Sequence, residues 1–247
     1  METNNNIRLD QFLPCVLPTE KIGYVFCSTI YPGKAGFIWY FKGVYPKEPE
    51  SVILFGTGST AEDIHTARMD CFKQQVEPLE GLWRAGISPE MVKGIIVDHA
   101  HWDHVGALDQ FPNAQIYIHR LELAESFSPR MDAYMDFAAD RLYVCRKRLR
   151  VIEDKKPYRI SDNMVLLWTG GHSPGHIVAL VNTDKGLVLF GGDIIMTREN
   201  ITRPFLEFYH DWEEVIAFQQ RLANLGADII ISGHDEKELE LHPNGKF

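Results

Sequence analysis

Short apolar runs separated by glycine-rich turns recur along the whole chain and predict many short strands. Between residues 24 and 45 such runs alternate with glycines, which is the rhythm of hairpin strands. Further strands are predicted at 51–55, 94–97, 115–119, 164–168, 177–181, 187–190 and 228–231. The polar segment 182–186 between two of these runs indicates a hairpin turn.

Helical segments are predicted at 61–86, 120–150 and 211–225. The third has the clearest pattern, because apolar residues from Trp212 to Leu225 recur at helical spacing and Gly226 follows them. Ser88-Pro89-Glu90 has the residue types of a helix start. Strands and helices in alternation indicate an α/β protein. Because no linker, long repeat or low-complexity segment divides the chain, we expect a single domain over residues 1–247.

Composition and charge narrow the class of partner. The chain has 247 residues, of which 45% are apolar and 24% charged, as in ordinary globular proteins. Its formal net charge of -9 argues against a nucleic-acid partner, because phosphate binding needs clustered positive charge. We therefore expect a small-molecule substrate.

The cysteines and the apolar stretches bear on location. The four cysteines are widely scattered and form no C-x-x-C pair, which is typical of reduced, packed residues. The first residues lack the basic and apolar segments of a secretory signal, and no apolar stretch approaches the ~20 residues of a membrane helix. We expect a cytoplasmic protein without a membrane partner. A homodimer stays open, since the aromatic-rich N-terminal loops could form a dimer contact.

The densest group of chemically active side chains follows the predicted strand 94–97. His99, His101, Asp103 and His104 lie within six residues. Imidazoles and carboxylates are ligands of cations such as Zn²⁺, and loops supply them at short spacing. Single histidines are more often structural, and His65, His119, His210 and His242 are interpreted in that way.

Other candidate ligands follow other predicted strands. The strand ends near 97, 168, 190 and 231 are each followed within a few residues by histidine or aspartate, the later ones by His172, His176, Asp193 and His234. In layered α/β proteins such loops gather at one edge of the sheets, so we expect these side chains to converge. The pattern indicates a two-metal hydrolytic site.

The run His-x-His-x-Asp-His with its later histidine, aspartate and histidine resembles the signature of the metallo-β-lactamase superfamily, from about Ser51 to His234. The resemblance implies a four-layer αββα sandwich with the metal site at one edge of two facing sheets. It also implies two Zn²⁺ ions, with Fe, Mn or Co as other divalent metals. His99, His101 and His172 would hold one ion, Asp103, His104 and His234 the second, and Asp193 would bridge both. His176 would orient the ligands.

Within this superfamily, Thr169 to His176 and Ser232 to Asp235 resemble segments of N-acyl-homoserine lactonases and related small-lactone hydrolases, as does Glu199-Asn200. This likeness implies a binuclear zinc-dependent hydrolase that opens a lactone, or cleaves a related ester, by metal-activated hydroxide. Asp103 would be the catalytic proton shuttle. Trp102, Met196 and Tyr209 are candidates for the substrate pocket.

Three departures leave the exact substrate open. Met196 stands where those lactonases often carry a tyrosine that polarises the substrate carbonyl, so Tyr209 is a candidate donor. Gly56 replaces the aspartate of many superfamily members, and Gly170 replaces a proline. All seven ligand candidates survive these changes.

Three alternative functions share parts of the pattern. A thioesterase of the glyoxalase II kind has every ligand, but its typical basic region is not evident after His234. An iron-dependent oxidoreductase of the diiron type usually carries glutamate where this chain has His101, whereas mononuclear-iron members are not separated by ligands alone. A catalytically silent binding protein usually lacks ligands, and none is missing here.

Overall fold

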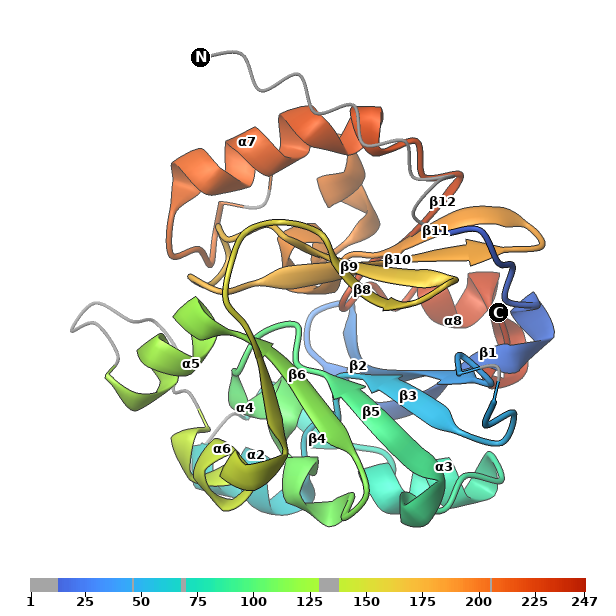
Figure 1. Ribbon diagram of the computed structural model, residues 1–247. Coiled ribbons are helices and arrows are strands. Elements are labelled where there is room, and N and C mark those ends of the chain that lie inside the picture. The colour runs from blue at the N-terminus through green and yellow to red at the C-terminus, as the bar shows by residue number, and fades with distance from the viewer. Residues whose placement is uncertain (1–12, 46, 68–69, 129–137, 205) are drawn as a thin grey trace.

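The computed structural model describes residues 13–45, 47–67, 70–128, 138–204 and 206–247. Its elements form two β-sheets with helices outside them (Figure 1). One sheet contains β1 (Ile22–Ile30), β2 (Lys34–Lys42), β3 (Val52–Phe55), β4 (Phe72–Gln74), β5 (Val92–Ile96), β6 (Gln115–His119) and β7 (Leu149–Ile152). The other contains β8 (Tyr158–Ser161), β9 (Met164–Trp168), β10 (Ile177–Thr183), β11 (Gly186–Phe190) and β12 (Ile229–Ile231).

The helices lie mainly in the connections between strands. They are α2 (Ala61–Ala67), α3 (Pro78–Arg84), α4 (Trp102–Val105), α5 (Arg120–Phe127), α6 (Ala139–Val144), α7 (Trp212–Leu222) and α8 (Glu238–Leu241). Single 3₁₀ turns occur at Thr19–Lys21, Pro89–Met91, Leu108–Gln110, Arg146–Arg148, Gly192–Ile195, Arg198–Ile201, Ala223–Leu225 and Pro243–Gly245. Within the described ranges, none of these helices has the length and apolarity needed to cross a membrane.

Strand direction brings several loops to one edge. The seven-stranded sheet has the order β4-β1-β2-β3-β5-β6-β7. Its strands β3, β5, β6 and β7 run parallel to one another. The five-stranded sheet has the order β12-β11-β10-β9-β8, with β11 and β12 parallel and Phe190 opposite Ile231. The loops after β11 and β12 therefore leave the sheet side by side. Because β9 and β10 are antiparallel, with Trp168 opposite Ile177, residues 169–176 form the hairpin between them.

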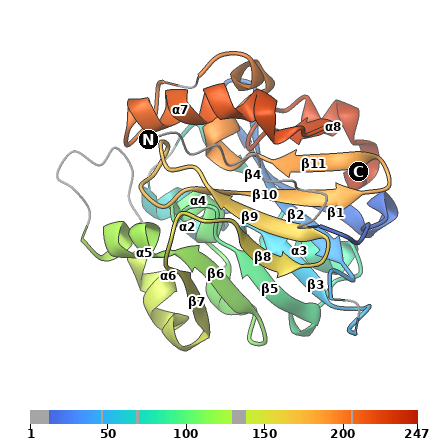
Figure 2. The same ribbon diagram turned by 45° about the horizontal axis from the view of Figure 1, so that its top comes forward.

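Side chains alternate between the two faces of each strand, so one apolar layer lies between the sheets and one lies on the outer face of each sheet. The two sheets and the helices outside them therefore form four structural layers. Ile53 and Phe55 of β3 face the core between the sheets, whereas Leu54 packs in the outer core with α3 and α6. Val178 and Leu180 of β10 face α7 on the other side. Figure 2 shows α7 along the outside of the five-stranded sheet. The predicted αββα sandwich is confirmed.

The prediction that the segment 61–86 is helical throughout is wrong. Residues 61–86 contain α2, the short strand β4 and α3, because Phe72–Gln74 pairs with the edge of β1 and Pro78 opens a new helix. The helical segment 120–150 is likewise divided into α5, α6 and β7, while residues 129–137 lie outside the described ones. The helix start at Ser88 leads only to a 3₁₀ turn without a side-chain cap.

Other element predictions are confirmed. The strands at 115–119 and 164–168 have the predicted bounds. Helix α7 begins after Asp211, whose carboxylate accepts hydrogen bonds from two backbone amides of its first turn, and Gly226 follows the subsequent 3₁₀ turn in a left-handed conformation. Trp212 is 51% exposed and so does not belong to the buried face. All four cysteines are free thiols.

Candidate metal centre

Two groups of ligand atoms meet where the loops after β5, β9, β11 and β12 converge. In the first group, His172 Nε2 lies 3.2 Å from His99 Nε2 and 3.3 Å from His101 Nδ1. In the second group, His104 Nε2 lies 3.1 Å from His234 Nε2. Asp103 Oδ2 completes the second group at 3.8 Å from His104 Nε2 and 3.7 Å from His234 Nε2. Each group could hold one metal ion.

The Asp193 carboxylate lies between the two groups. Its Oδ1 atom is 3.1 Å from His234 Nε2 and 3.3 Å from His104 Nε2. Its Oδ2 atom is 3.5 Å from His172 Nε2 and 3.8 Å from His99 Nε2. One oxygen thus faces each group, which is the arrangement that a bridging carboxylate requires.

Hydrogen bonds at the outer Nδ1 atoms of His172 and His234 determine whether their inward Nε2 atoms carry a proton. The Nδ1 atom of His234 lies 2.9 Å from the Ala35 carbonyl oxygen, and that of His172 lies 3.1 Å from the Phe208 carbonyl oxygen. A carbonyl can only accept, so both Nδ1 atoms carry a proton. In the neutral imidazole each Nε2 atom then directs a lone pair into the centre.

This donor set fits divalent cations. The Oδ1 atom of Asp193 is buried and accepts no hydrogen bond from any residue in the described part of the chain. Buried oxygens without partners are costly, and inward lone pairs only 3.1–3.2 Å apart repel one another. A cation in each group would satisfy both, and imidazole nitrogen with carboxylate oxygen is a zinc-type ligand set.

Burial and neighbouring charges control protonation in the centre. Burial, with the adjacent His99, holds the pKa of His172 well below its usual value, which favours the neutral, metal-binding form. Burial alone would raise the pKa of Asp193, but in the metal-free centre the positive charge of protonated His234 and His104 outweighs it and holds that pKa well below the usual range. The bridging candidate is therefore an anion.

Glu122 of α5 hydrogen-bonds to the loops that carry the first group. Its buried carboxylate accepts hydrogen bonds from the Ala100 amide at 2.7 Å, the Ser173 hydroxyl at 2.6 Å and the Gly175 amide at 2.9 Å. These donors lie in the two loops that carry His99 and His172. Sequence reasoning missed Glu122, because nothing local in a helical segment marks this role.

Gly56 and Thr57 support the second group. The Thr57 amide and hydroxyl both donate to the His104 carbonyl oxygen, at 2.6 and 3.2 Å. Gly56 has a φ of 69°, so the chain turns there in a left-handed conformation that suits glycine. The glycine that departs from the superfamily pattern therefore serves a backbone turn against the ligand loop.

His176 lies beside the ligand groups. Its Nδ1 atom is 2.8 Å from the Thr169 hydroxyl oxygen, and its ring centroid is 5.5 Å from that of His99 and 5.7 Å from that of His172. Its buried Nε2 atom has no hydrogen-bond partner among the described residues. Packing against both rings is compatible with an orienting role, which stays a prediction.

The three pocket candidates occupy different surroundings. Trp102 is 7% exposed and packs on Phe72, with ring centroids 4.8 Å apart. Met196 is also 7% exposed, and its carbonyl oxygen accepts the His234 amide at 2.8 Å. Tyr209 is 39% exposed and follows Phe208, whose carbonyl faces His172. Their roles toward a substrate stay predictions.

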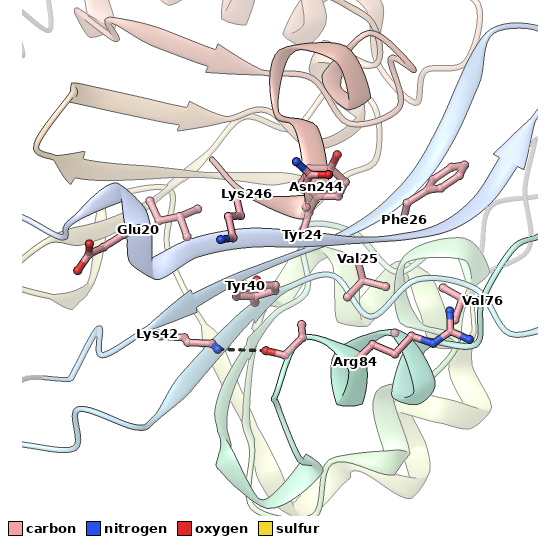
Figure 3. A pocket seen from close by; sticks show the side chains of 14 residues that line it. Glu20, Tyr24, Val25, Phe26, Tyr40, Lys42, Val76, Arg84, Asn244 and Lys246 are labelled. Atoms are coloured by element: carbon pink, nitrogen blue, oxygen red, sulfur yellow. Dashed lines mark hydrogen bonds between the residues drawn. The ribbon is translucent and has the colours of Figure 1, made fainter.

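A separate cavity of about 540 Å³ lies between β1, β2, α3 and the C-terminal segment (Figure 3). None of the seven ligand candidates lines it. Two of its cationic side chains are engaged by protein groups, since Lys42 donates to the Ala85 carbonyl oxygen at 3.2 Å and Arg84 pairs with Glu80.

Comparison with known proteins identifies the family of the chain. Residues 36–234 match the family model of the metallo-beta-lactamase superfamily. An N-acyl homoserine lactonase of Bacillus cereus is 33% identical over 171 residues, which are 66% of this chain and 64% of that protein. The N-acyl homoserine lactonase AttM of Azorhizobium caulinodans is 29% identical over 160 residues, which are 61% of this chain and 60% of that protein. The chain thus matches less than two thirds of the length of these relatives.

Solved structures show the same fold at lower identity. An N-acyl homoserine lactone hydrolase, solved with the product N-hexanoyl-L-homoserine at its catalytic metal centre, has a TM-score of 0.74 and 21% identity. The superposition covers 92% of this chain and 97% of that one. A mutant of AiiA from B. thuringiensis also gives 0.74, with 22% identity and the same coverage. With the sequence match over most of its length, the chain belongs to the metallo-beta-lactamase superfamily.

Proposed function

We propose that this protein is a binuclear zinc hydrolase that opens a lactone ring or cleaves a related ester. The observation that carries the proposal is the position of Asp193, with one oxygen toward each of two histidine groups. A likeness to N-acyl homoserine lactonases in sequence supports the lactone as substrate class.

In this proposal His99, His101 and His172 hold one ion, Asp103, His104 and His234 hold the other, and Asp193 contacts both. Two such cations would supply Lewis acidity and favour the ionisation of water near neutral pH. The protein contributes preformed geometry, because the outer nitrogens of His172 and His234 are already fixed by carbonyl oxygens.

Asp103 is the proposed proton shuttle. Its Oδ2 atom faces the second histidine group, whereas its buried Oδ1 atom accepts no hydrogen bond within the described ranges. That free oxygen can take a proton and pass it to the leaving oxygen of the opened ring. Of the pocket candidates, Met196 has no proton to donate to a carbonyl, while the Tyr209 hydroxyl has one.

The decisive experiment measures activity and metal content on one sample. The zinc-loaded protein is assayed against short- and long-chain lactones, thioesters and amides, while its metals are quantified. We expect two zinc ions per chain and the highest kcat/KM on a lactone. No ring opening on any lactone would refute the lactone assignment, preferred thioester cleavage would favour the thioesterase, and redox-active iron would favour the oxidoreductase.

A matched pair of variants tests the site itself. His101→Ala removes an inward ligand, whereas His65→Ala removes an exposed histidine of α2. We expect H101A to lose metal and activity and H65A to retain both. If H101A keeps the full metal content and turnover, the ligand assignment is wrong.

A further inference from the structure

Asp98 is a fully buried carboxylate directly before the ligand signature. Its Oδ2 atom lies 3.2 Å from His99 Nδ1 and 3.1 Å from His104 Nδ1. Its Oδ1 atom lies 3.3 Å from the same His104 Nδ1 atom. The opposite nitrogens of these two imidazoles belong to different ligand groups, since His99 belongs with His172 and His104 with His234. One side chain therefore contacts an imidazole of each group.

The chemistry of a carboxylate determines the protonation of both rings. An ionised carboxylate only accepts hydrogen bonds, so each Nδ1 atom that faces Asp98 must donate. In the neutral imidazole each Nε2 atom is then left with a lone pair directed at the centre. An outer carboxylate of this kind fixes the tautomer and ring orientation of a ligating histidine and makes it more basic.

The surroundings of Asp98 keep the carboxylate in place. Its backbone carbonyl accepts the Ile177 amide at 2.9 Å. A Cβ atom at Gly192, next to Asp193, would lie 2.7 Å from Asp98 Oδ2 and 2.9 Å from His176 Nε2. Since contacts so short are not tolerated, only glycine fits at position 192, and the chain after β11 packs closely against the Asp98 carboxylate.

We infer that Asp98 is a positioning residue shared by both metal groups, which holds His99 and His104 in the tautomer that binds a cation. Its loss therefore weakens both sites together, although it contacts the two imidazoles only at their outer Nδ1 atoms. This inference rests on the proposed two-metal site and adds a residue that connects its halves.

Zinc titration of the metal-free Asp98→Asn variant tests the inference without an activity assay. Asparagine keeps the size of the side chain but lacks the charge and replaces one acceptor oxygen by a donor. We expect both zinc equivalents to bind about 10–100-fold more weakly than in the wild type. The ligand-field absorption of the Co²⁺-substituted protein should change as well.

The matched control is Asp63→Asn. Asp63 hydrogen-bonds to Thr60 and Arg141 and contacts no ligand candidate, so D63N should bind both equivalents as the wild type does. Unchanged affinity of either equivalent in a folded D98N would overturn the inference, whereas a wild type that binds fewer than two equivalents would overturn the proposed site and the inference with it.

If D98N does not fold, a measurement on the wild type still tests the inference. In the zinc-loaded protein with ¹⁵N-labelled histidines, NMR should show a protonated Nδ1 atom on both His99 and His104. An unprotonated Nδ1 atom on either ring would overturn the inference.

Discussion

The Glu122 carboxylate accepts the Ala100 amide at 2.7 Å and so ties α5 to the backbone between two ligand candidates. Its other oxygen accepts the Ser173 hydroxyl and the Gly175 amide of the loop between β9 and β10. A single buried side chain thus connects both loops that supply the first histidine group.

Replacing Glu122 by glutamine should therefore destabilise the protein. The amide nitrogen would face backbone and hydroxyl donors, which leaves buried groups unsatisfied at a cost of about 1–3 kcal/mol in the free energy of unfolding. Denaturant unfolding of E122Q checks this. Glu62→Gln, at an exposed position of α2, is the control and should unfold as the wild type does. Equal midpoints for E122Q and E62Q would show that the three hydrogen bonds add no net stability.

Gly175 should not tolerate a side chain. A Cβ atom there would overlap the backbone nitrogen of Glu122, and neither backbone can move without displacing a ligand loop. We expect Gly175→Ala to lower the unfolding free energy by about 1–3 kcal/mol, as overpacking does. Gly226→Ala separates this clash from backbone strain, because Gly226 has a φ of 67° but open space around it. A smaller loss in G175A than in G226A would contradict the clash.

The seven ligand candidates could be predicted because their signal is local. Four of them lie within six residues, and the other three follow strands whose ends the apolar runs mark. Glu122 gave no such signal, since it meets Ser173 across 51 positions and does so only after α5 packs behind the loop. Asp98 adjoins the signature, but its contacts with two imidazoles depend on how α4 turns His104 back toward it.

The strands that the apolar pattern missed share a place in the sheets. β4 and β7 are the two edges of one sheet, and β8 is an edge of the other. Edge strands are partly exposed, so their side chains do not form the apolar runs that mark central strands such as β3 and β10. Pairing with a neighbour, which only the folded chain provides, decides their conformation.

Removing the metal should lower thermal stability. A ligand present at 100 times its Kd stabilises the folded state by about 2.7 kcal/mol, which corresponds to a Tm change of roughly 5–10 °C in a chain of this size. Calorimetry before and after chelation measures the change. Zn²⁺ should restore the Tm, whereas Mg²⁺, which prefers oxygen ligands, should not. An unchanged Tm after complete chelation would contradict a metal centre that stabilises the fold.

His119 should contribute a pH-dependent part of the stability. Its Nδ1 atom accepts the Leu121 amide at the start of α5, and burial lowers the pKa of this imidazole, so the folded state favours the neutral form. A lowered pKa means that the stabilisation is present above the unfolded value of about 6.5 and is lost as the pH falls below it.

The comparison of the wild type with His119→Asn isolates that contribution. Asparagine also caps helices but does not titrate. Between about pH 7.5 and about pH 5.5 the wild type should lose more unfolding free energy than H119N, since every other histidine is common to both. If the unfolding free energies of the wild type and H119N changed in parallel with pH, the loss would belong to other titratable groups.

Met196 offers a direct test of how a substrate carbonyl is polarised. The residue follows the 3₁₀ turn that carries Asp193, and its carbonyl oxygen accepts the His234 amide, so its backbone is fixed beside both ligand groups. A thioether cannot donate a hydrogen bond, whereas a phenol at this position could. Because one preorganised donor to an oxyanion is worth about 10²–10³ in kcat, Met196→Tyr should raise the kcat for lactones by up to about 100-fold. Met196→Phe adds the ring without the hydroxyl and should not. Equal kcat values for M196Y and M196F would mean that the carbonyl lies out of reach of this residue and that another donor, such as Tyr209, polarises it.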